Sequence, residues 1–254
     1  MILAIDVGNT NITLGGYADN KIQFISRLAT DSRRTADQYA VELYDLVRLA
    51  GFSATDTEGS VIASVVPAVG TAIAEAVKKL TNTTPIVLGP GVKTGVNIKI
   101  DNPAQLGADL AAGAAGAIDK YPMPAIIIDM GTATTLSVMD KNGAFIGGVI
   151  AAGIGLTLNA LTQNTALLSA IPIEAPKNTI GKNTVECMQS GLVLGTAAMI
   201  DGMVSRIECE LGEKCTVVAT GGRAGQIIPY CATKMQLDDN LLLDGLIKIY
   251  YKNI

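Results

Sequence analysis

The sequence predicts an α/β protein made of two related halves, and three observations support this prediction. A buried-strand pattern that ends in aspartate and continues to glycine occurs twice, at residues 2–13 and 125–135. In both halves, runs of β-branched residues alternate with segments of helical periodicity. A chain of 254 residues can bury a large core, either as one large domain or as two smaller ones.

The first copy, ILAIDVGNTNIT, places Asp6 at the end of an apolar run that is typical of a buried strand. A charged carboxylate in that position is unfavourable unless a cation or hydrogen-bond donors lie beside it. Gly8 permits a tight turn there, and the small polar residues Asn9 and Thr10 follow. One such copy alone is more typical of an ordinary hairpin turn than of a functional loop.

The next elements of the first half follow from periodicity and end signals. We expect a strand at residues 21–29. The following helix should begin behind Thr35, with Gln38 completing a capping box, and should end at Gly51. After it we expect a strand at residues 61–66, a helix at residues 68–80 that Asn82 ends, and another strand at residues 85–88.

One carboxylate is isolated in a segment made almost entirely of Leu, Ala and Gly. We expect this segment to be a helix with Asn102 as its N-cap. Asp109 is the only charge in its body and shares a face with Leu106, Gly113 and Gly116. Such a carboxylate is either hydrogen-bonded for structure or exposed to a cleft for function, and the residues alone leave both readings open.

The second copy of the strand–turn pattern follows a YPMP segment at residues 121–124, where we expect the second domain to begin. It places Asp129 at the end of a buried strand and Gly131 in the turn. Thr132, Thr134 and Thr135 then offer hydroxyl and N–H groups for phosphate oxygens. Because both copies lead to a second turn signal at a similar distance, we interpret them as one unit used twice, with both loops facing one cleft.

Three further features mark the second half. Residues 183–186 form a capping-box pattern that begins a long helix ending at Gly212. The first turn of this helix and the Thr184 hydroxyl would suit an acidic or hydroxylated substrate group, although ordinary capping explains the pattern equally well. A third strand leads into Thr-Gly-Gly at residues 220–222, and we expect Asp238 to cap the last helix.

Composition excludes several classes of protein. The net charge of −4 leaves no basic surplus for a nucleic-acid partner, and no apolar run approaches the length of a membrane span. Without histidine or a CxxC pair, the chain has no zinc site and no Ser–His or Cys–His catalysis, so a base would most simply be a carboxylate. GPGVKTG is not a P-loop, because Val92 stands where that motif requires glycine. We interpret the four cysteines as reduced and buried and expect a cytoplasmic protein.

Several segments are similar to a known family. The DVGNT and DMGTATT turns resemble the two phosphate loops of the superfamily of acetate and sugar kinases, heat-shock ATPases and actin. The segments GPGVKTGVNIKIDNP, LGAD, IGGVIAAGIG, PKNTIGKNTVECMQSG and ATGGRAG resemble the type III pantothenate kinases within it. The resemblance implies two ribonuclease-H-like (actin-like ATPase) domains, at residues 1–120 and 121–254, with ATP and substrate in the cleft between them. It also implies transfer of the γ-phosphoryl group of ATP to the primary hydroxyl of pantothenate, the first step of coenzyme A biosynthesis.

The resemblance further implies a role for each matching residue. Asp109 of LGAD corresponds to the catalytic base, while Asp6 and Asp129 correspond to residues that hold cations. The cofactors implied are ATP with Mg²⁺ or another divalent cation and a monovalent cation (K⁺ or NH₄⁺) at Asp129, and the assembly implied is a homodimer. The residues expected to bind ATP are Asp6, Val7, Gly8, Asn9, Thr10, Asn11, Ile12, Thr13, Thr132, Gly221 and Gly222. The residues expected to contact the hydroxyl substrate are Ile100, Gly107, Ala108, Asp109, Leu110 and Thr184.

The chain departs from the family at two positions on the substrate side. Relatives carry an arginine after LGAD and a tyrosine before DNP, both of which contact pantothenate, whereas this chain has Leu110 and Ile100. Loss of an arginine that pairs with a carboxylate should weaken binding by about 1.5–3 kcal/mol. Two alternatives follow, a related kinase for an uncharged hydroxyl compound and a regulatory relative that binds nucleotide without turnover. The retained Asp109 and both phosphate loops argue against the regulatory relative.

Overall fold

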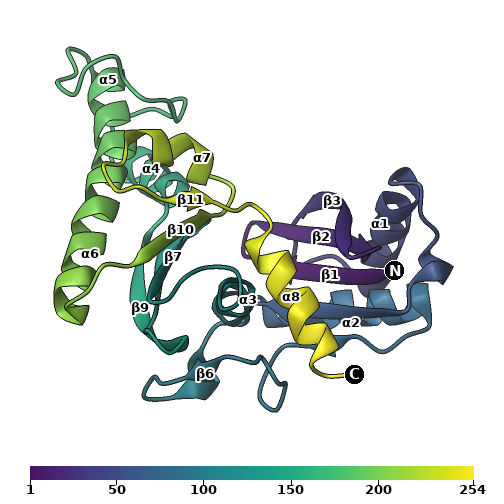
Figure 1. Ribbon diagram of the computed structural model, residues 1–254. Helices are drawn as coiled ribbons and strands as arrows, with labels where there is room; N and C mark the ends of the chain where they lie inside the picture. The colour runs from purple at the N-terminus through teal and green to yellow at the C-terminus, as the bar shows by residue number, and fades with distance from the viewer. The chain divides into compact units, whose positions relative to one another are not determined.

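The computed structural model describes residues 1–254 and divides into two compact units. The first contains Met1–Lys120 together with Asn240–Ile254, and the second contains Tyr121–Asp239. The chain enters the second unit at the YPMP segment and returns to the first unit for its last helix (Figure 1). The expected division into residues 1–120 and 121–254 would instead assign this helix to the second domain.

The first unit is a sheet with helices on both faces. Its strands are ordered β3-β2-β1-β4-β5, with β1 antiparallel to β2 and parallel to β4. The strands are β1 (Ile2–Val7), β2 (Asn11–Ala18), β3 (Lys21–Ala29), β4 (Gly59–Ser64) and β5 (Ile86–Val87). The helices are α1 (Ala36–Leu49), α2 (Pro67–Thr81), α3 (Ala108–Ala117) and α8 (Leu241–Tyr251). The short strand β6 (Asn97–Ile98) and 3₁₀ turns at Ala54–Asp56 and Pro103–Gln105 complete the unit.

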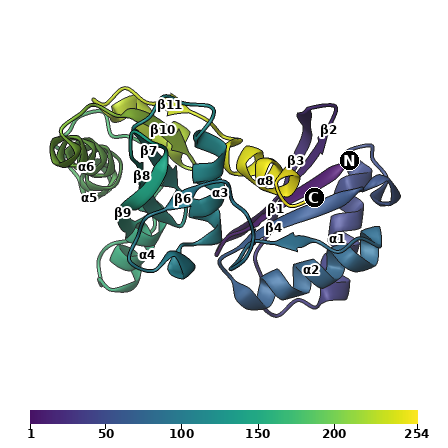
Figure 2. The same ribbon diagram turned by 60° about the horizontal axis from the view of Figure 1, so that its bottom comes forward.

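The alternation of side chains along β1 decides which face each residue occupies. Ile5 and Val7 pack with residues of α1 and α2, whereas Ile2 and Ala4 pack with residues of α3 and α8. Figure 2 shows α3 and α8 on the side of β1 away from α1 and α2. Asp6 alternates with Ile5 and Val7, so its carboxylate lies on the face of α3 and α8, at the end of the strand.

The second unit has the same layout around β7. Its five strands are ordered β11-β10-β7-β8-β9, with β7 antiparallel to β8 and parallel to β10. They are β7 (Ala125–Met130), β8 (Ala133–Met139), β9 (Ala144–Ala152), β10 (Thr216–Thr220) and β11 (Gln236–Leu237). The helices are α4 (Ile154–Gln163), α5 (Thr184–Gln189), α6 (Gly195–Leu211) and α7 (Ala224–Ile227), with a π-helical turn at Ser190–Leu194 and a 3₁₀ turn at Ile228–Tyr230.

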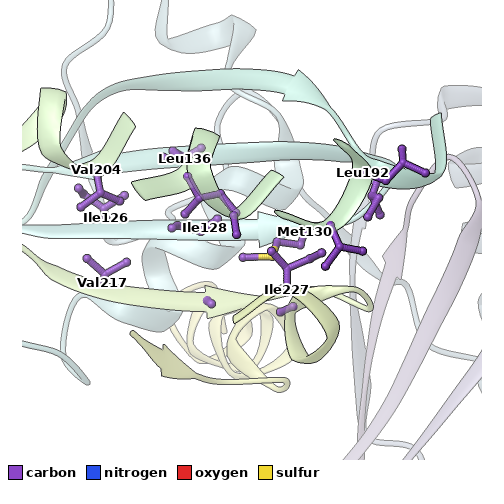
Figure 3. Close-up of a cluster of buried hydrophobic side chains, with 14 of the residues drawn as sticks. Ile126, Ile128, Met130, Leu136, Leu192, Val204, Val217 and Ile227 are labelled. Atoms are coloured by element: carbon purple, nitrogen blue, oxygen red, sulfur yellow. The ribbon is translucent and has the colours of Figure 1, made fainter. Parts of the chain in front are cut away.

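The helices of the second unit share a core with one face of its sheet. β7 contributes Ile126, Ile128 and Met130 to this core. Figure 3 shows them packed among Leu136, Leu192, Val204, Val217 and Ile227. Because Asp129 alternates with Ile128 and Met130, its carboxylate lies on the sheet face opposite to these helices.

The two units therefore repeat one topology. The order β3-β2-β1-β4 in the first matches β9-β8-β7-β10 in the second, and in each the aspartate is the last residue but one of the central strand, β1 or β7. The prediction of an α/β protein with a duplicated strand–turn–strand unit is confirmed. The capping box of Thr35 and Gln38 at α1 is also confirmed, as is the left-handed Asn82 that ends α2.

The helix that carries Asp109 begins later than the sequence suggested. The Asn102 side chain accepts a hydrogen bond from the Ala104 amide, but this closes only the 3₁₀ turn Pro103–Gln105. Leu106 is extended, Gly107 is the N-cap, and α3 begins at Ala108. We had expected Leu106 to share a helix face with Asp109, but Leu106 lies outside the helix. Asp109 lies in the first turn of α3.

Two other expectations are wrong in detail. Asp238 does not cap the last helix, because Asn240 is the N-cap of α8 and the Asp238 carboxylate accepts a hydrogen bond from the Tyr121 hydroxyl at 2.8 Å. The cysteines are all free, but they are not all buried, since Cys187 and Cys209 are exposed. Both lie on the helical surface rather than in the core of their unit.

One helical segment is long and apolar enough to cross a membrane, contrary to the expectation from the sequence. It is the continuous helix Thr184–Leu211, which joins α5, the π-helical turn and α6. Length and composition are weak evidence, because core helices pass the same test. Here Leu192, Val193 and Ile200 lie in the core of the second unit.

Candidate active site

The loop after Asp6 is a short turn between β1 and β2. Gly8 donates its amide hydrogen bond to the Asn11 carbonyl at 3.0 Å, which closes the turn. Thr30, just past the end of β3, donates its hydroxyl to the Gly8 carbonyl at 2.7 Å and its amide to the Thr10 carbonyl at 3.0 Å. The loop is thus held from outside, while the side chains of Asn9 and Thr10 remain exposed above the end of β1.

The other residues of the Asp6 stretch have structural positions in the hairpin. Val7 and Ile12 are buried and paired across β1 and β2, so their side chains hold the strands together. Thr13 is paired opposite Asp6 in the same ladder, and Asn11 is exposed at the start of β2. Of the predicted ATP-binding residues in this half, Asp6, Asn9, Thr10 and Asn11 therefore present polar groups at the loop.

The loop after Asp129 is the matching turn between β7 and β8. Gly131 donates its amide to the Ala133 carbonyl at 3.0 Å. Gly153, the residue that follows β9 and caps α4, donates its amide to the Thr132 carbonyl at 3.1 Å. This bond corresponds to the one from Thr30 in the first unit, because both come from the residue just beyond the third strand of the repeat.

A third turn, which follows β10, lies in close contact with Asp129. Gly221 has φ of +94°, and a Cβ on it would overlap the Oδ1 atom of Asp129 and the backbone of Met130. Only glycine allows both the backbone conformation and this close approach. The Arg223 amide also donates to the Met130 carbonyl at 3.1 Å. The second unit thus brings Asp129, Thr132 and Gly221 together, with Gly222 beside them in open space.

The threonines of the second loop do not all serve the same face. Thr135 is the cross-strand partner of Asp129, and its hydroxyl oxygen is buried without a hydrogen-bond partner. Thr134 alternates with it and is buried on the core side with Leu136. Its hydroxyl therefore does not lie on the face of Asp129, although we had expected it there. An unsatisfied hydroxyl opposite a carboxylate is an arrangement that suits an oxygen-coordinated cation.

Asp109 lies in an apolar setting at the start of α3. Its Oδ1 atom accepts the Leu110 amide at 2.8 Å, and a Cβ on Gly107 would lie 2.5 Å from the same oxygen. The glycine of LGAD therefore leaves room for the carboxylate to fold over the helix start. Burial raises the pKa of Asp109 above its usual range, against the lowering effect of the backbone hydrogen bonds. A desolvated carboxylate without a cation beside it is suited to accept a proton.

The remaining substrate-side residues are divided between the units. Ala108 and Leu110 flank Asp109 in the first turn of α3, and Ile100 is half-buried a few residues before the 3₁₀ turn. Thr184 belongs to the second unit, where it is the exposed first residue of α5. Asn183 caps this helix by accepting the Glu186 amide at 2.9 Å.

No group of three or more Cys, Asp or Glu side chains could hold a metal ion alone. A cation at Asp6 or Asp129 would need oxygens from a nucleotide and from water, which is the usual manner of binding for Mg²⁺ with phosphates. The carboxylates at the two strand ends fit this role. Sequence reasoning missed Thr30, which alignment of the two repeats at their third strands could have found, because it occupies the place of Gly153.

A family model described as type III pantothenate kinase matches residues 2–206. The chain belongs to this family. A type III pantothenate kinase from Exiguobacterium sibiricum is 45% identical over 253 residues, which cover 100% of both chains. Those from Halalkalibacterium halodurans and Moorella thermoacetica are 42% and 41% identical, again over 100% of both chains.

Solved structures of other proteins share the fold at low sequence identity. Component A of the (R)-2-hydroxyglutaryl-CoA dehydratase of Acidaminococcus fermentans matches with a TM-score of 0.59 and 16% identity, covering 99% of this chain and 97% of that chain. The activator of the 2-hydroxyisocaproyl-CoA dehydratase from Clostridium difficile, with bound ADPNP, gives 0.57 and 14%, covering 99% and 93%. These likenesses support the actin-like ATPase fold alone.

Proposed function

We propose that this type III pantothenate kinase transfers the γ-phosphoryl group of ATP to the primary hydroxyl of pantothenate, the first step of coenzyme A biosynthesis. The observation that carries the proposal is a desolvated carboxylate, Asp109, in the unit whose Asp6 lies on the same sheet face as α3. The hydroxyl oxygen bonds to the γ-phosphorus while the bond from that phosphorus to the β–γ bridging oxygen breaks, and ADP leaves. Asp109 accepts the hydroxyl proton.

The two loops divide the binding of ATP. Residues 6–13 hold the metal–phosphate end of the nucleotide, with Asp6 as the carboxylate and the exposed Asn9 and Thr10 as donors. Thr132 binds phosphate from the second loop, and Gly221 and Gly222 accept the adenosine. A divalent cation bound with ATP would neutralise charge on the phosphates during transfer.

A monovalent cation, K⁺ or NH₄⁺, would be held at Asp129. The support for this site is the Thr135 hydroxyl, which is buried, has no partner and lies opposite Asp129 in the β7–β8 ladder. Two protein oxygens from one ladder pair, completed by phosphate oxygens and water, would suit a large, weakly hydrated cation. The Asp129 carboxylate would then be neutralised where the phosphates bind.

We also propose a cytoplasmic homodimer. From Gly191 to Ser205, the exposed residues of α6 and the turn before it are all small, and a Cβ at Gly191 or Gly202 would meet nothing within 4 Å. Small residues on one helix face permit close approach of a second helix. The four free cysteines support a reducing compartment. Light scattering on the purified protein tests the dimer.

A second candidate function rests on two residues of the substrate side. Leu110 and Ile100 are apolar where a carboxylate-binding arginine and a tyrosine are expected in this family. An apolar lining favours an uncharged hydroxyl substrate over an acid. Pantothenate binding would then depend on a weaker donor such as the first turn of α5 at Thr184.

ADP release with pantothenate and with pantothenol, its uncharged alcohol analogue, separates the two candidates. For a pantothenate kinase we expect turnover of the acid with a high KM, which Leu110→Arg should lower by about tenfold or more through a charged hydrogen bond. Melting curves must accompany the kinetics, because an unpaired arginine in an apolar setting is destabilising. Turnover of pantothenol but not of pantothenate, with Leu110→Arg only harmful, would leave a kinase with a different acceptor.

A further inference from the structure

The last helix, α8, crosses α3 with backbone contacting backbone. A Cβ on Gly245 would overlap the carbonyl oxygen of Ala112 and lie 2.8 Å from the amide nitrogen of Gly116. A Cβ on Gly116 would in turn overlap the carbonyl oxygen of Leu241. A glycine inside a helix is less stable than alanine by about 1 kcal/mol. The packing at this crossing must therefore offset the intrinsic weakness of both helices, and any side chain added there would drive them apart.

Polar contacts hold the same crossing at the end of α3. Lys248 donates from Nζ to the Gly116 carbonyl at 3.2 Å and lies 3.6 Å from the Asp119 carboxylate. Lys120 pairs with Asp244 of α8 at 2.9 Å. A cation at the C-terminal end of a helix is favourable, because the last carbonyls are unpaired there. α8 thus fixes both the separation from α3 and the far end of that helix.

The opposite end of α3 carries Asp109, on the face that α8 contacts. Ala112 and Gly116 follow Asp109 by three and seven residues, so all three lie on one side of the helix. The hydrogen bonds to the Asp109 carboxylate come from backbone amides of its own turn. Residues 111–117 are all alanine or glycine and offer no large side chain to fix the helix. The place of the carboxylate is therefore set by whatever packs against the α3 backbone.

We propose that Gly245 is a positioning residue for the base Asp109, acting through the close crossing of α8 and α3. The proposal rests on the role given to Asp109 in the proposed function. Gly245 touches no reactant in this account. Its effect comes from geometry, because a misplacement of about 1 Å can cost about 100-fold in rate.

The test compares Gly245→Ala with Gly113→Ala. Gly113 faces the same helix with room to spare, since its Cβ would lie 3.8 Å from Leu242 Cδ1, although it is only one turn from Asp109. We expect Gly245→Ala to lower kcat by about 10- to 100-fold with the KM for ATP unchanged. We expect Gly113→Ala to stay within about twofold of wild type, the scale of a substitution without new contacts.

The pH profile separates positioning from mere stability. Displacing α3 would hydrate Asp109 and lower its pKa toward the ordinary value, so the acid limb of kcat in Gly245→Ala should shift to lower pH. A folded Gly245→Ala enzyme with the wild-type kcat and acid limb would overturn the proposal. Equal losses in Gly245→Ala and Gly113→Ala would also overturn it, because the effect would then belong to α3 alone.

A second variant covers the case in which Gly245→Ala does not fold. Lys248→Met removes the hydrogen bond to Gly116 without adding a clash, and should shift the acid limb in the same direction by a smaller amount. An unshifted limb in that variant contradicts the proposal. Asp109→Asn separates the assignment of Asp109 as the base from the positioning role of Gly245. If this variant keeps full turnover, both fail. If it is inactive while Gly245→Ala behaves as wild type, only the positioning role fails.

Discussion

The loops after Asp6 and Asp129 are two versions of one turn, and they differ in how they are held. The Asp6 loop is one residue longer and is braced by the Thr30 hydroxyl and amide, with exposed polar side chains above it. Backbone amides brace the Asp129 loop, and Gly153 and Gly221 lie so close that Cβ atoms on them would overlap atoms of the loop and of the end of β7. The first is therefore open to a bulky metal–phosphate group, whereas the second is a tight cradle.

The two units also differ in what lies beside the aspartate. On the face of Asp6, the first unit packs α3, which carries the desolvated Asp109. In the second unit the cross-strand partner of the aspartate is Thr135, whose hydroxyl oxygen is buried and without a hydrogen-bond partner. The duplicated fold thus gives two matching loops, but the proposed base belongs to one copy and the unpartnered hydroxyl to the other.

We expect the largest effect from replacing Asp109, which has no counterpart in the second unit. Asp109→Asn keeps the size of the side chain but cannot accept the hydroxyl proton, so kcat should fall by about 10²–10⁴-fold. ATP affinity by calorimetry should hardly change, because Asp109 is not among the residues proposed to bind ATP. If ATP affinity fell in step with turnover, Asp109 would be a nucleotide ligand instead.

The same variant has a predicted effect on stability. Because burial raises the pKa of Asp109 in the folded state, the folded protein loses stability as the pH rises from the unfolded-state value through the folded one. Asp109→Asn should therefore melt at a higher temperature than wild type at pH 8, and the gain should vanish below about pH 4, the ordinary range of an Asp. A lower melting temperature at pH 8 would mean that the carboxylate has a stabilising partner.

A smaller effect should distinguish the tight loop from the open one. Gly221→Ala forces a side chain onto a left-handed backbone and against Asp129, which should lower stability by about 1–3 kcal/mol. Gly8→Ala meets only the Asn11 carbonyl, at 3.1 Å, and should be milder. Thermal melts and the KM for ATP measure both. A Gly8→Ala protein less stable than Gly221→Ala would reverse the comparison.

The smallest effect concerns the brace that only the first loop has. Thr30→Val removes the hydroxyl bond to the Gly8 carbonyl and should lower stability by about 0.5–1.5 kcal/mol, with a rise of a few-fold in the KM for ATP. Thr30→Ser keeps the hydroxyl and serves as the control. A loss in Thr30→Ser as large as that in Thr30→Val would show that the effect does not follow the hydrogen bond.

Much of the fold was predictable because strand ends, caps and turns are local. The Asp-x-Gly pattern, the Thr35 capping box and Asn82 each act within a few residues, and the structure confirms them. The start of α3 was missed because Asn102 and Pro103 satisfy the same end signals in a 3₁₀ turn. The role of Asp238 was missed because its partner, Tyr121, is far away in sequence.

In the candidate site, we could predict only those residues whose type and sequence neighbours already indicate a chemical role. Asp6, Asp109 and Asp129 stand out as lone carboxylates in apolar segments. Thr30 and Gly245 do not, because their importance comes from a long-range hydrogen bond and a helix crossing. The difference between Thr134 and Thr135 likewise depends on which sheet face is covered, and the sequence pattern at these positions does not show this.

The central claim, that Asp6 and Asp129 hold different cations for phosphoryl transfer, is tested most directly by cation titrations of Asp6→Asn and Asp129→Asn. ADP release is measured against Mg²⁺ at saturating K⁺ and against K⁺ at saturating Mg²⁺, with circular dichroism to verify the fold. We expect both variants to lose at least about 100-fold in turnover at wild-type cation levels, the scale of removing an electrostatic group from a transition state. Asp6→Asn should raise only the Mg²⁺ requirement, and Asp129→Asn only the K⁺ requirement. A folded Asp129→Asn enzyme with full turnover, or identical cation responses in both variants, would contradict the account.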